Sequence, residues 1–130
     1  MMVVTTSIYA AVLTALYIYL SFQVIGRRRG QQISLGTGED RLLEKRVRAH
    51  GNFAEYAPLG IVLLALAELN GAPAVAVHGL GLLLTAGRAM HAYAFLTRRM
   101  VFKLRVAGMV STFAALAFSA LAALAYGLAG

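Results

Sequence analysis

The sequence contains no cysteine and no tryptophan, and only 13% of its 130 residues are charged. Without cysteine the chain forms no disulfide, offers no thiolate to a metal and has no cysteine nucleophile. An average soluble domain carries about 25% charged residues. A small soluble domain needs an even larger polar share, because its surface is large relative to its volume. We therefore do not expect a soluble fold, and we expect no metal site.

Long apolar segments take the place of the missing charges, and hydrophobic residues make up 60% of the chain. Residues 1–25 and 106–130 contain no charged residue. A helix needs about 20 mostly apolar residues to cross the hydrocarbon core of a bilayer. We predict an all-α integral membrane protein, a four-helix bundle forming one domain over residues 1–130. Its four transmembrane helices are expected at about 3–25, 41–69, 73–97 and 105–128.

The charges that remain are mostly basic, with 12 lysines and arginines against 5 acidic residues. All of the basic residues except Arg88 lie in two connections, at 27–48 and 98–105. Basic connections stay in the cytoplasm, so we predict that both termini lie outside it. Because orientation in the membrane accounts for the net charge of +7, we expect no nucleic-acid partner.

A polar stripe stands out in the second helix. Arg48, Asn52 and Glu55 are spaced i, i+4 and i+7 and share one face, with Tyr56 beside them and His50 pointing elsewhere. The stripe descends about 10 Å from the cytoplasmic surface, at about 1.5 Å per residue. Two interpretations are open: a structural ion pair near the interface, or a polar pocket that opens to the cytoplasm.

Arg88 strengthens the second interpretation. It lies about 15 Å from the basic end of the third helix, near the middle of the membrane. An arginine at that depth needs a partner, and Glu55 is the best available acid. His91 is one turn from Arg88 on the same face. The alternative to a binding site is an ion pair between Arg88 and Glu55 that only holds the second and third helices together.

These residues resemble a known family. Residues 48–58 (RAHGNFAEYAP) resemble the signature of the MAPEG family, the membrane-associated proteins in eicosanoid and glutathione metabolism. The segments at 23–29, 35–38 and 87–91 are similar to further family segments in the same order. The resemblance covers almost the whole chain and is greatest to the bacterial branch, which implies a multi-pass protein of the bacterial inner membrane.

The resemblance implies a homotrimer with sites between neighbouring subunits near the cytoplasmic face. It implies that glutathione is the co-substrate and that lipophilic small molecules from the bilayer are the second substrate, for transferase or peroxidase chemistry. It assigns Arg105 to stabilising the glutathione thiolate. Phe95 departs from the family, because it replaces a tyrosine of the mammalian enzymes. The expected glutathione-binding residues are Arg28, Arg29, Arg48, His50, Asn52, Glu55, Tyr56, Arg88, His91 and Tyr93.

The residue types in this set suit glutathione, which carries two carboxylates and one ammonium group. Arg28 and Arg48 suit the carboxylates, and Glu55 suits the ammonium group. Arg105 would lower the pKa of the thiol, whose thiolate is the reactive form. Two other functions stay open: a catalytically silent membrane scaffold of the same fold, and a small proton-coupled transporter that uses Glu55.

Overall fold

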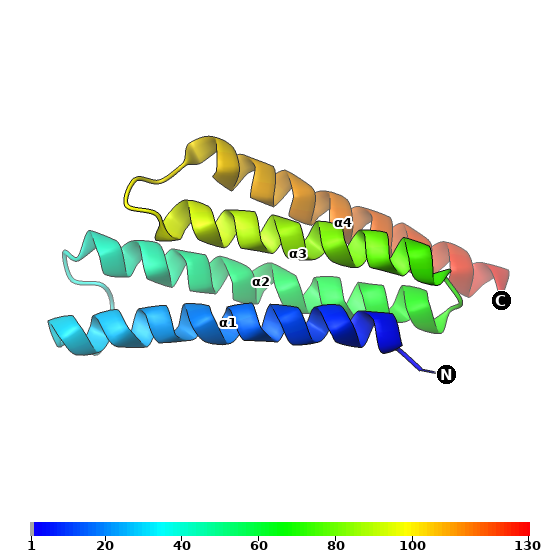
Figure 1. Cartoon of the computed structure of the whole chain (residues 1–130), viewed down its shortest axis with the longest axis horizontal. Helices are drawn as coiled ribbons and strands as arrows, with labels where there is room; N and C mark the ends of the chain where they lie inside the picture. The colour runs from blue at the N-terminus through cyan, green and yellow to red at the C-terminus, as the bar shows by residue number, and fades with distance from the viewer. Residues whose placement is uncertain (1) are drawn as a thin grey trace.

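A computed structural model describes residues 2–130, and it has four long α-helices that run alternately in opposite directions (Figure 1). The two basic connections lie at one end of the bundle, and the termini lie at the other. Within residues 2–130, α1 and α4 do not contact each other, so α2 and α3 form the middle of the bundle. The helices are α1 (Val4–Gln31), α2 (Arg41–Leu69), α3 (Ala74–Leu96) and α4 (Phe102–Ala129).

Three of these helices, α1, α2 and α4, are long and apolar enough to cross a membrane. The fourth predicted span, α3, runs beside the other three helices but falls below this criterion of apolar composition, so its crossing of the membrane stays a prediction. The reason lies in its polar residues, which include Arg88 and His91 and lower its mean hydropathy. Both side chains are buried, because α3 packs against all three other helices. The bundle therefore keeps the polar part of α3 away from lipid.

The basic ends of α1 and α2 show how local chemistry sets the helix bounds. α1 continues to Gln31, beyond the expected end at residue 25, and the arginines of its last turn lie at the negative end of the helix dipole. The chain then turns at Gln32, which has a positive φ of 54°. α2 begins after Asp40, whose carboxylate accepts a hydrogen bond of 2.7 Å from the backbone N–H of Leu43. Asp40 is thus the N-cap of α2, a position where aspartate is among the preferred residues.

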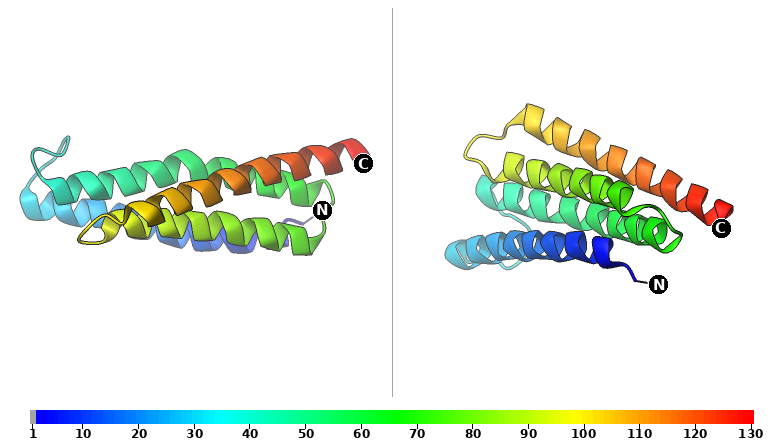
Figure 2. Two further views of the ribbon diagram at one scale, coloured as in Figure 1. Left: turned by 90° about the horizontal axis from the view of Figure 1, so that it is seen from above. Right: turned by 45° about the vertical axis from the view of Figure 1, so that its right-hand side comes forward.

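The helices α3 and α4 cross obliquely and in close contact (Figure 2). Two glycines allow the close approach, Gly87 on α3 and Gly108 on α4. A Cβ added to Gly108 would lie 2.6 Å from the backbone nitrogen of His91, and a Cβ added to Gly87 would lie 2.8 Å from the hydroxyl oxygen of Thr112. Small residues at helix crossings in membranes serve this purpose. The crossing brings polar groups of both helices together at the same level.

At the end of the bundle far from the basic connections, hydrogen bonds between side chains and backbone groups join the helices. The Glu68 carboxylate at the end of α2 accepts from the backbone N–H groups of Thr5 and Thr6, at 2.9 and 2.7 Å. These are free N–H groups of the first turn of α1. The side-chain amide of Asn70 donates to the carbonyl of Ala123 in α4, at 2.9 Å. Three helices are therefore held together at this end.

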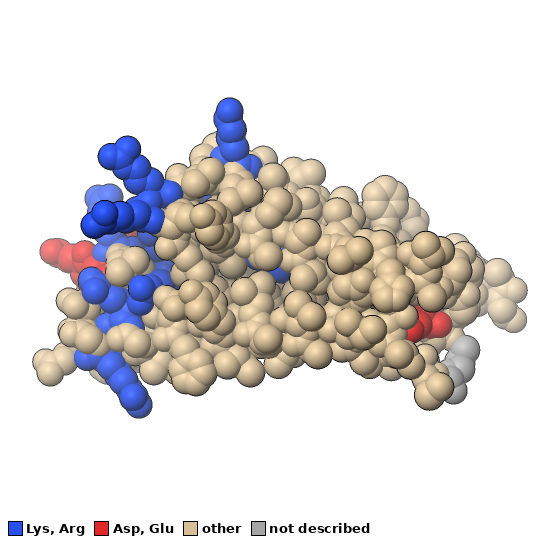
Figure 3. All heavy atoms as spheres, in the orientation of Figure 1, with Lys and Arg blue, Asp and Glu red and all other residues tan. Residues whose placement is uncertain are grey.

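Charged side chains gather at the opposite end, and on the face seen in Figure 3 the surface between the two ends is almost free of them. The middle of the bundle is packed with apolar side chains from all four helices, such as Leu13, Leu20, Phe53, Leu84 and Ala115. A band of exposed apolar residues also covers the outside, including Ile18, Phe22, Phe113 and Phe118. This is the surface that a bilayer requires.

Candidate functional site

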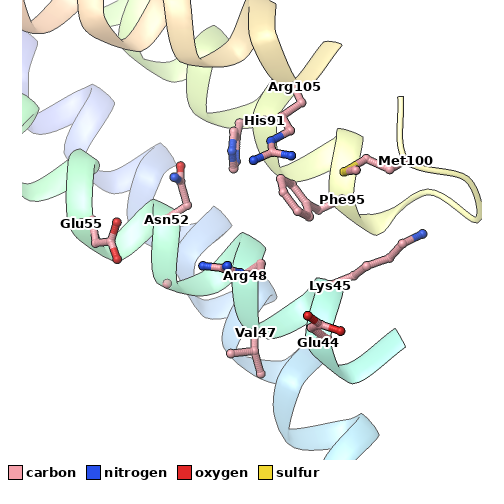
Figure 4. Close-up of a pocket in the computed structure, with 11 residues that line it drawn as sticks. Glu44, Lys45, Val47, Arg48, Asn52, Glu55, His91, Phe95, Met100 and Arg105 are labelled. Atoms are coloured by element: carbon pink, nitrogen blue, oxygen red, sulfur yellow. The ribbon is translucent and has the colours of Figure 1, made fainter. Parts of the chain in front are cut away.

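A cavity of about 520 Å³ lies at the basic end, between α2 and the facing ends of α3 and α4 (Figure 4). Its size is in the range of small-molecule sites. It is lined by both acidic and basic side chains, which sets it apart from two further hollows, one between α1 and α2 and one between α1 and α3. The residues drawn and labelled around it are Glu44, Lys45, Val47, Arg48, Asn52, Glu55, His91, Phe95, Met100 and Arg105.

The wall of the cavity on α2 is the polar stripe seen in the sequence. Arg48, Asn52 and Glu55 all line it, which agrees with the i, i+4, i+7 spacing. Sequence reasoning missed Lys45 and Glu44, which extend the stripe by one turn toward the basic end. The same helical spacing would have found both. Lys45 also donates to the carbonyls of residues 97 and 98, at 3.4 and 3.2 Å, and so ties α2 to the end of α3.

The opposite wall comes from α3 and α4. The His91 and Phe95 rings pack with their centroids 5.0 Å apart. The Arg105 guanidinium lies 5.1 Å from the centre of the Phe95 ring, within the range of cation–π attraction. Arg105 therefore lies across the cavity from Arg48 (Figure 4). Because Phe95 carries no hydroxyl, this wall offers His91 and Arg105 as its polar groups.

Arg88 lies behind the cavity wall and does not line it, and only 1% of its surface is exposed. The expected pairing with Glu55 is wrong. Arg88 donates to the Asn52 side-chain oxygen at 2.6 Å and the Thr112 hydroxyl at 3.0 Å, and contacts the sulfur of Met109 at 3.2 Å. Glu55 is exposed, and the one salt bridge among residues 2–130 joins a different pair. The sequence concealed these α4 partners, because only the glycine crossing brings them to Arg88.

Two of the expected ligand residues face away from the cavity. His50 stacks on Tyr17 of α1, with ring centroids 4.9 Å apart, and lies on the other side of α2. Arg28 donates to the backbone carbonyls of Ile33 and Gly36, at 3.3 and 2.7 Å. Arg28 therefore supports the turn that follows α1, and within one chain it does not reach the cavity.

Three further residues also lie outside the cavity. Arg29 is exposed at the end of α1. Tyr93 is 61% exposed and lines a separate hollow between α1 and α3, so it does not supply the hydroxyl that Phe95 lacks. Tyr56 packs against Phe113 at 5.5 Å between ring centroids, and the Arg88 guanidinium lies 5.3 Å from its ring centre. The single chain thus brings together Arg48, Asn52, Glu55, His91 and Arg105.

Comparison with known proteins identifies the family of the chain. Residues 6–125 match the MAPEG family. The chain belongs to the MAPEG family. It is 39% identical over 121 residues to "Inner membrane protein YecN" of Escherichia coli strain K12, an alignment that covers 93% of this chain and 91% of YecN. YecN of Escherichia coli O6:H1 matches to the same extent.

The cavity of this MAPEG protein is lined by charges of both signs, with more cations than carboxylates. Lys45, Arg48 and Arg105 supply three cations around it, and Glu44 and Glu55 supply two carboxylates. Asn52 adds neutral hydrogen-bonding groups between the charges. Such a mixture suits a ligand that carries both signs with an excess of negative charge, because each ligand charge finds a fixed opposite charge. A purely apolar ligand would gain nothing from it.

Proposed function

We propose that this MAPEG protein is a membrane-bound, glutathione-dependent transferase or peroxidase that acts on lipophilic electrophiles. One observation carries the proposal: three cations and two carboxylates surround Asn52 in a single cavity at the end of the bundle. Glutathione carries two carboxylates, one ammonium group and one thiol, and so matches these charges. The family to which the chain belongs supports the same ligand.

Each wall of the cavity has its own task in this proposal. Arg48 binds a glutathione carboxylate, since a guanidinium offers two parallel donors to a carboxylate. Glu55, two turns along the same helix, binds the ammonium group. Arg105 on the opposite wall lies near the thiol and favours its thiolate form, because a nearby cation lowers the pKa of a thiol. In the transferase reaction the thiolate sulfur forms a bond to carbon of the electrophile, and the leaving group departs with the electron pair of its broken bond. In the peroxidase reaction the sulfur takes one peroxide oxygen as the O–O bond breaks, the alkoxide takes up a proton, and a second glutathione converts the sulfenic acid to glutathione disulfide and water.

The electrophile reaches the site through the bilayer in this proposal. The exposed apolar faces of α1 and α4 place the protein in lipid, where lipophilic compounds are concentrated. The similarity to the Escherichia coli inner membrane protein YecN supports the inner membrane as the location. The basic end with its cavity then faces the cytoplasm, where glutathione is dissolved, in agreement with the distribution of Lys and Arg.

We also propose that the protein is a homotrimer, as the MAPEG resemblance implies. Arg28, Arg29, His50, Tyr56 and Tyr93 lie outside the cavity of their own chain. In a trimer, some of them would complete the cavity of a neighbouring subunit. Native mass spectrometry of the protein released from detergent should give three copies of the 13.8 kDa chain. A monomer as the main species would contradict this.

Replacing Arg48 by alanine tests the binding site. We expect the wild-type protein in detergent to be retained on a glutathione-affinity resin and Arg48→Ala to be lost from it, because the variant lacks the carboxylate anchor. Arg99→Ala is the matched control, since Arg99 is exposed in the α3–α4 connection and does not line the cavity. Equal retention of the Arg48 variant would contradict the assignment. Retention without turnover of 1-chloro-2,4-dinitrobenzene or a peroxide would favour the silent scaffold.

Replacing Arg105 by alanine tests the chemical step. The variant should still bind glutathione, because Arg48 and Glu55 remain. It should lose the ultraviolet absorbance of the bound thiolate at neutral pH, since the neighbouring cation is gone. Turnover should fall with it, by about tenfold for each unit by which the thiol pKa rises above the assay pH. An unchanged thiolate signal would assign the role to another residue.

A further inference from the structure

A buried arginine without a carboxylate partner needs an explanation. Arg88 is among the largest fully buried side chains of the protein, and its hydrogen bonds go to neutral groups only. Burying a charge in a membrane protein is costly, so such residues commonly serve a function. We propose that Arg88 is a positioning residue, which turns the amide of Asn52 so that its N–H donors face the cavity.

The argument starts from hydrogen-bond chemistry. A guanidinium only donates hydrogen bonds, whereas an asparagine amide has one acceptor oxygen and one donor nitrogen. One Arg88 nitrogen, Nη1, donates to both the side-chain oxygen of Asn52 at 2.6 Å and its backbone oxygen at 3.1 Å. The side-chain oxygen of Asn52 must therefore point toward Arg88. Its amide nitrogen has no acceptor among residues 2–130 and remains free for a ligand of the cavity.

Arg88 itself is held in place from several sides. Its Nε donates to the Thr112 hydroxyl at 3.0 Å, and this hydroxyl donates to the Gly108 carbonyl at 2.7 Å. Its Nη2 lies 3.2 Å from the sulfur of Met109, and its guanidinium carbon lies 5.3 Å from the centre of the Tyr56 ring. Because the partners come from α2 and α4, the guanidinium of Arg88 has little freedom to turn. The orientation of the Asn52 amide is therefore fixed before a ligand arrives.

This orientation has a consequence for specificity. At Asn52 the cavity offers donors only, so the ligand group at this point must be a hydrogen-bond acceptor, such as a carbonyl or carboxylate oxygen. An ammonium group is excluded there and is directed to Glu55, which is one turn farther along α2. With glutathione as the ligand, which rests on the function proposed above, Asn52 would hold a peptide carbonyl or a carboxylate. Arg88 would thus set which way round the ligand binds without contacting it.

A double-mutant cycle on glutathione binding tests the proposal. Asn52→Ala and Arg88→Met should each weaken the calorimetric Kd for glutathione by about tenfold, the effect of losing one oriented hydrogen bond. In the double variant the loss should stay near tenfold, because Arg88 acts through Asn52. Arg88→Lys, which retains a donor, should recover part of the affinity. Arg99→Met, an exposed substitution of the same kind, should bind as the wild type does.

Losses that multiply to about a hundredfold in the double variant would overturn the proposal, because the two residues would then act independently. A second measurement does not depend on glutathione. The side-chain NH₂ pair of Asn52 in ¹⁵N-labelled protein should shift strongly in Arg88→Met and little in Arg99→Met. An unmoved pair would also overturn the proposal. If the wild type binds no glutathione, the proposed function fails. The shift of this NH₂ pair then tests by itself whether Arg88 holds the Asn52 amide.

Discussion

Asp40 shows at the scale of single residues how one side chain joins two helices. Its carboxylate accepts the backbone N–H of Leu43 and forms the salt bridge with Arg27, at 2.7 Å between Nη2 and Oδ2. The hydrogen bond from Arg27 lowers the pKa of the Asp40 carboxyl, and the N–H of Leu43 lowers it further. Asp40 thus caps α2 and, through Arg27, also links the start of α2 to the last turns of α1.

The lowered pKa of Asp40 predicts how stability depends on pH. A carboxyl whose pKa is lower in the folded state stabilises the fold above its ordinary pKa of 3.8, and this contribution is lost as the pH falls through the folded value. Asp40→Asn keeps a good cap but removes the charge. Thermal unfolding in detergent should show a lower Tm than the wild type at pH 7, with the difference disappearing in strong acid.

The matched control for this prediction is Glu39→Gln. This substitution also removes one negative charge, from the residue next to Asp40. The Glu39 side chain is exposed and has no hydrogen-bond partner within residues 2–130. Its Tm should follow that of the wild type across the same pH range. A pH-independent loss in Asp40→Asn would mean that the cap is affected, and the ion pair would then not be the cause.

At the scale of elements, the crossing of α3 and α4 positions the site. Gly87 and Gly108 let the two backbones meet, and the same crossing carries Arg88 to Thr112 and places Arg105 near His91. A larger residue at either glycine would push the helices apart at the level where the polar residues lie. The geometry of the cavity therefore depends on two positions that carry no polar side chain.

Gly108→Ala should disturb both stability and the site. The added methyl group would lie 2.6 Å from the backbone nitrogen of His91, which forces the helices to shift. Overpacking of this kind costs about 1–3 kcal/mol in unfolding free energy. Denaturation in mixed micelles should show this loss, along with weaker glutathione binding. Gly79→Ala is the control, because a Cβ on Gly79 of α3 meets no atom within 4 Å; an equal loss there would exclude the crossing as the cause.

At the scale of the whole molecule, charge separation accounts for the net charge of +7. Basic residues are concentrated around the two connections at one end, and the other end is tied by the hydrogen bonds of Glu68 and Asn70. A basic end resists transfer across a membrane, so the molecule is expected to insert in one orientation. The same end holds the cavity, so in the predicted orientation the cavity would open toward the cytoplasm.

Reporter fusions test this orientation. Alkaline phosphatase fused after Gly130 should be active and green fluorescent protein at the same position should be dark, because the C-terminus is predicted to lie outside the cytoplasm. The same reporters inserted after Gly36, in the α1–α2 connection, should give the opposite pattern. Fluorescence from the C-terminal fusion would contradict the predicted orientation. Equal signals from both reporters would indicate mixed insertion and would contradict it as well.

Part of the site could be predicted because helical spacing is a local property. Arg48, Asn52 and Glu55 line one cavity because residues three and four positions apart share a face of a helix. The partner of Arg88 could not be found this way. Charge alone favoured Glu55, whereas the neutral groups of Asn52 and Thr112 lie closer once the helices are packed. Distances between helices depend on packing, which no spacing along the chain reveals.

The amino-acid sequence by itself determined the four helices and the separation of charge from apolar segments, because these follow from short-range periodicity and from the cost of placing charge in lipid. Only the tertiary structure decided that Arg88 lies behind the cavity and that His50 stacks on Tyr17. It also decided that α3 lies in the middle of the bundle. The physical reason is the close α3–α4 crossing, which the glycines permit and only the packed bundle realises.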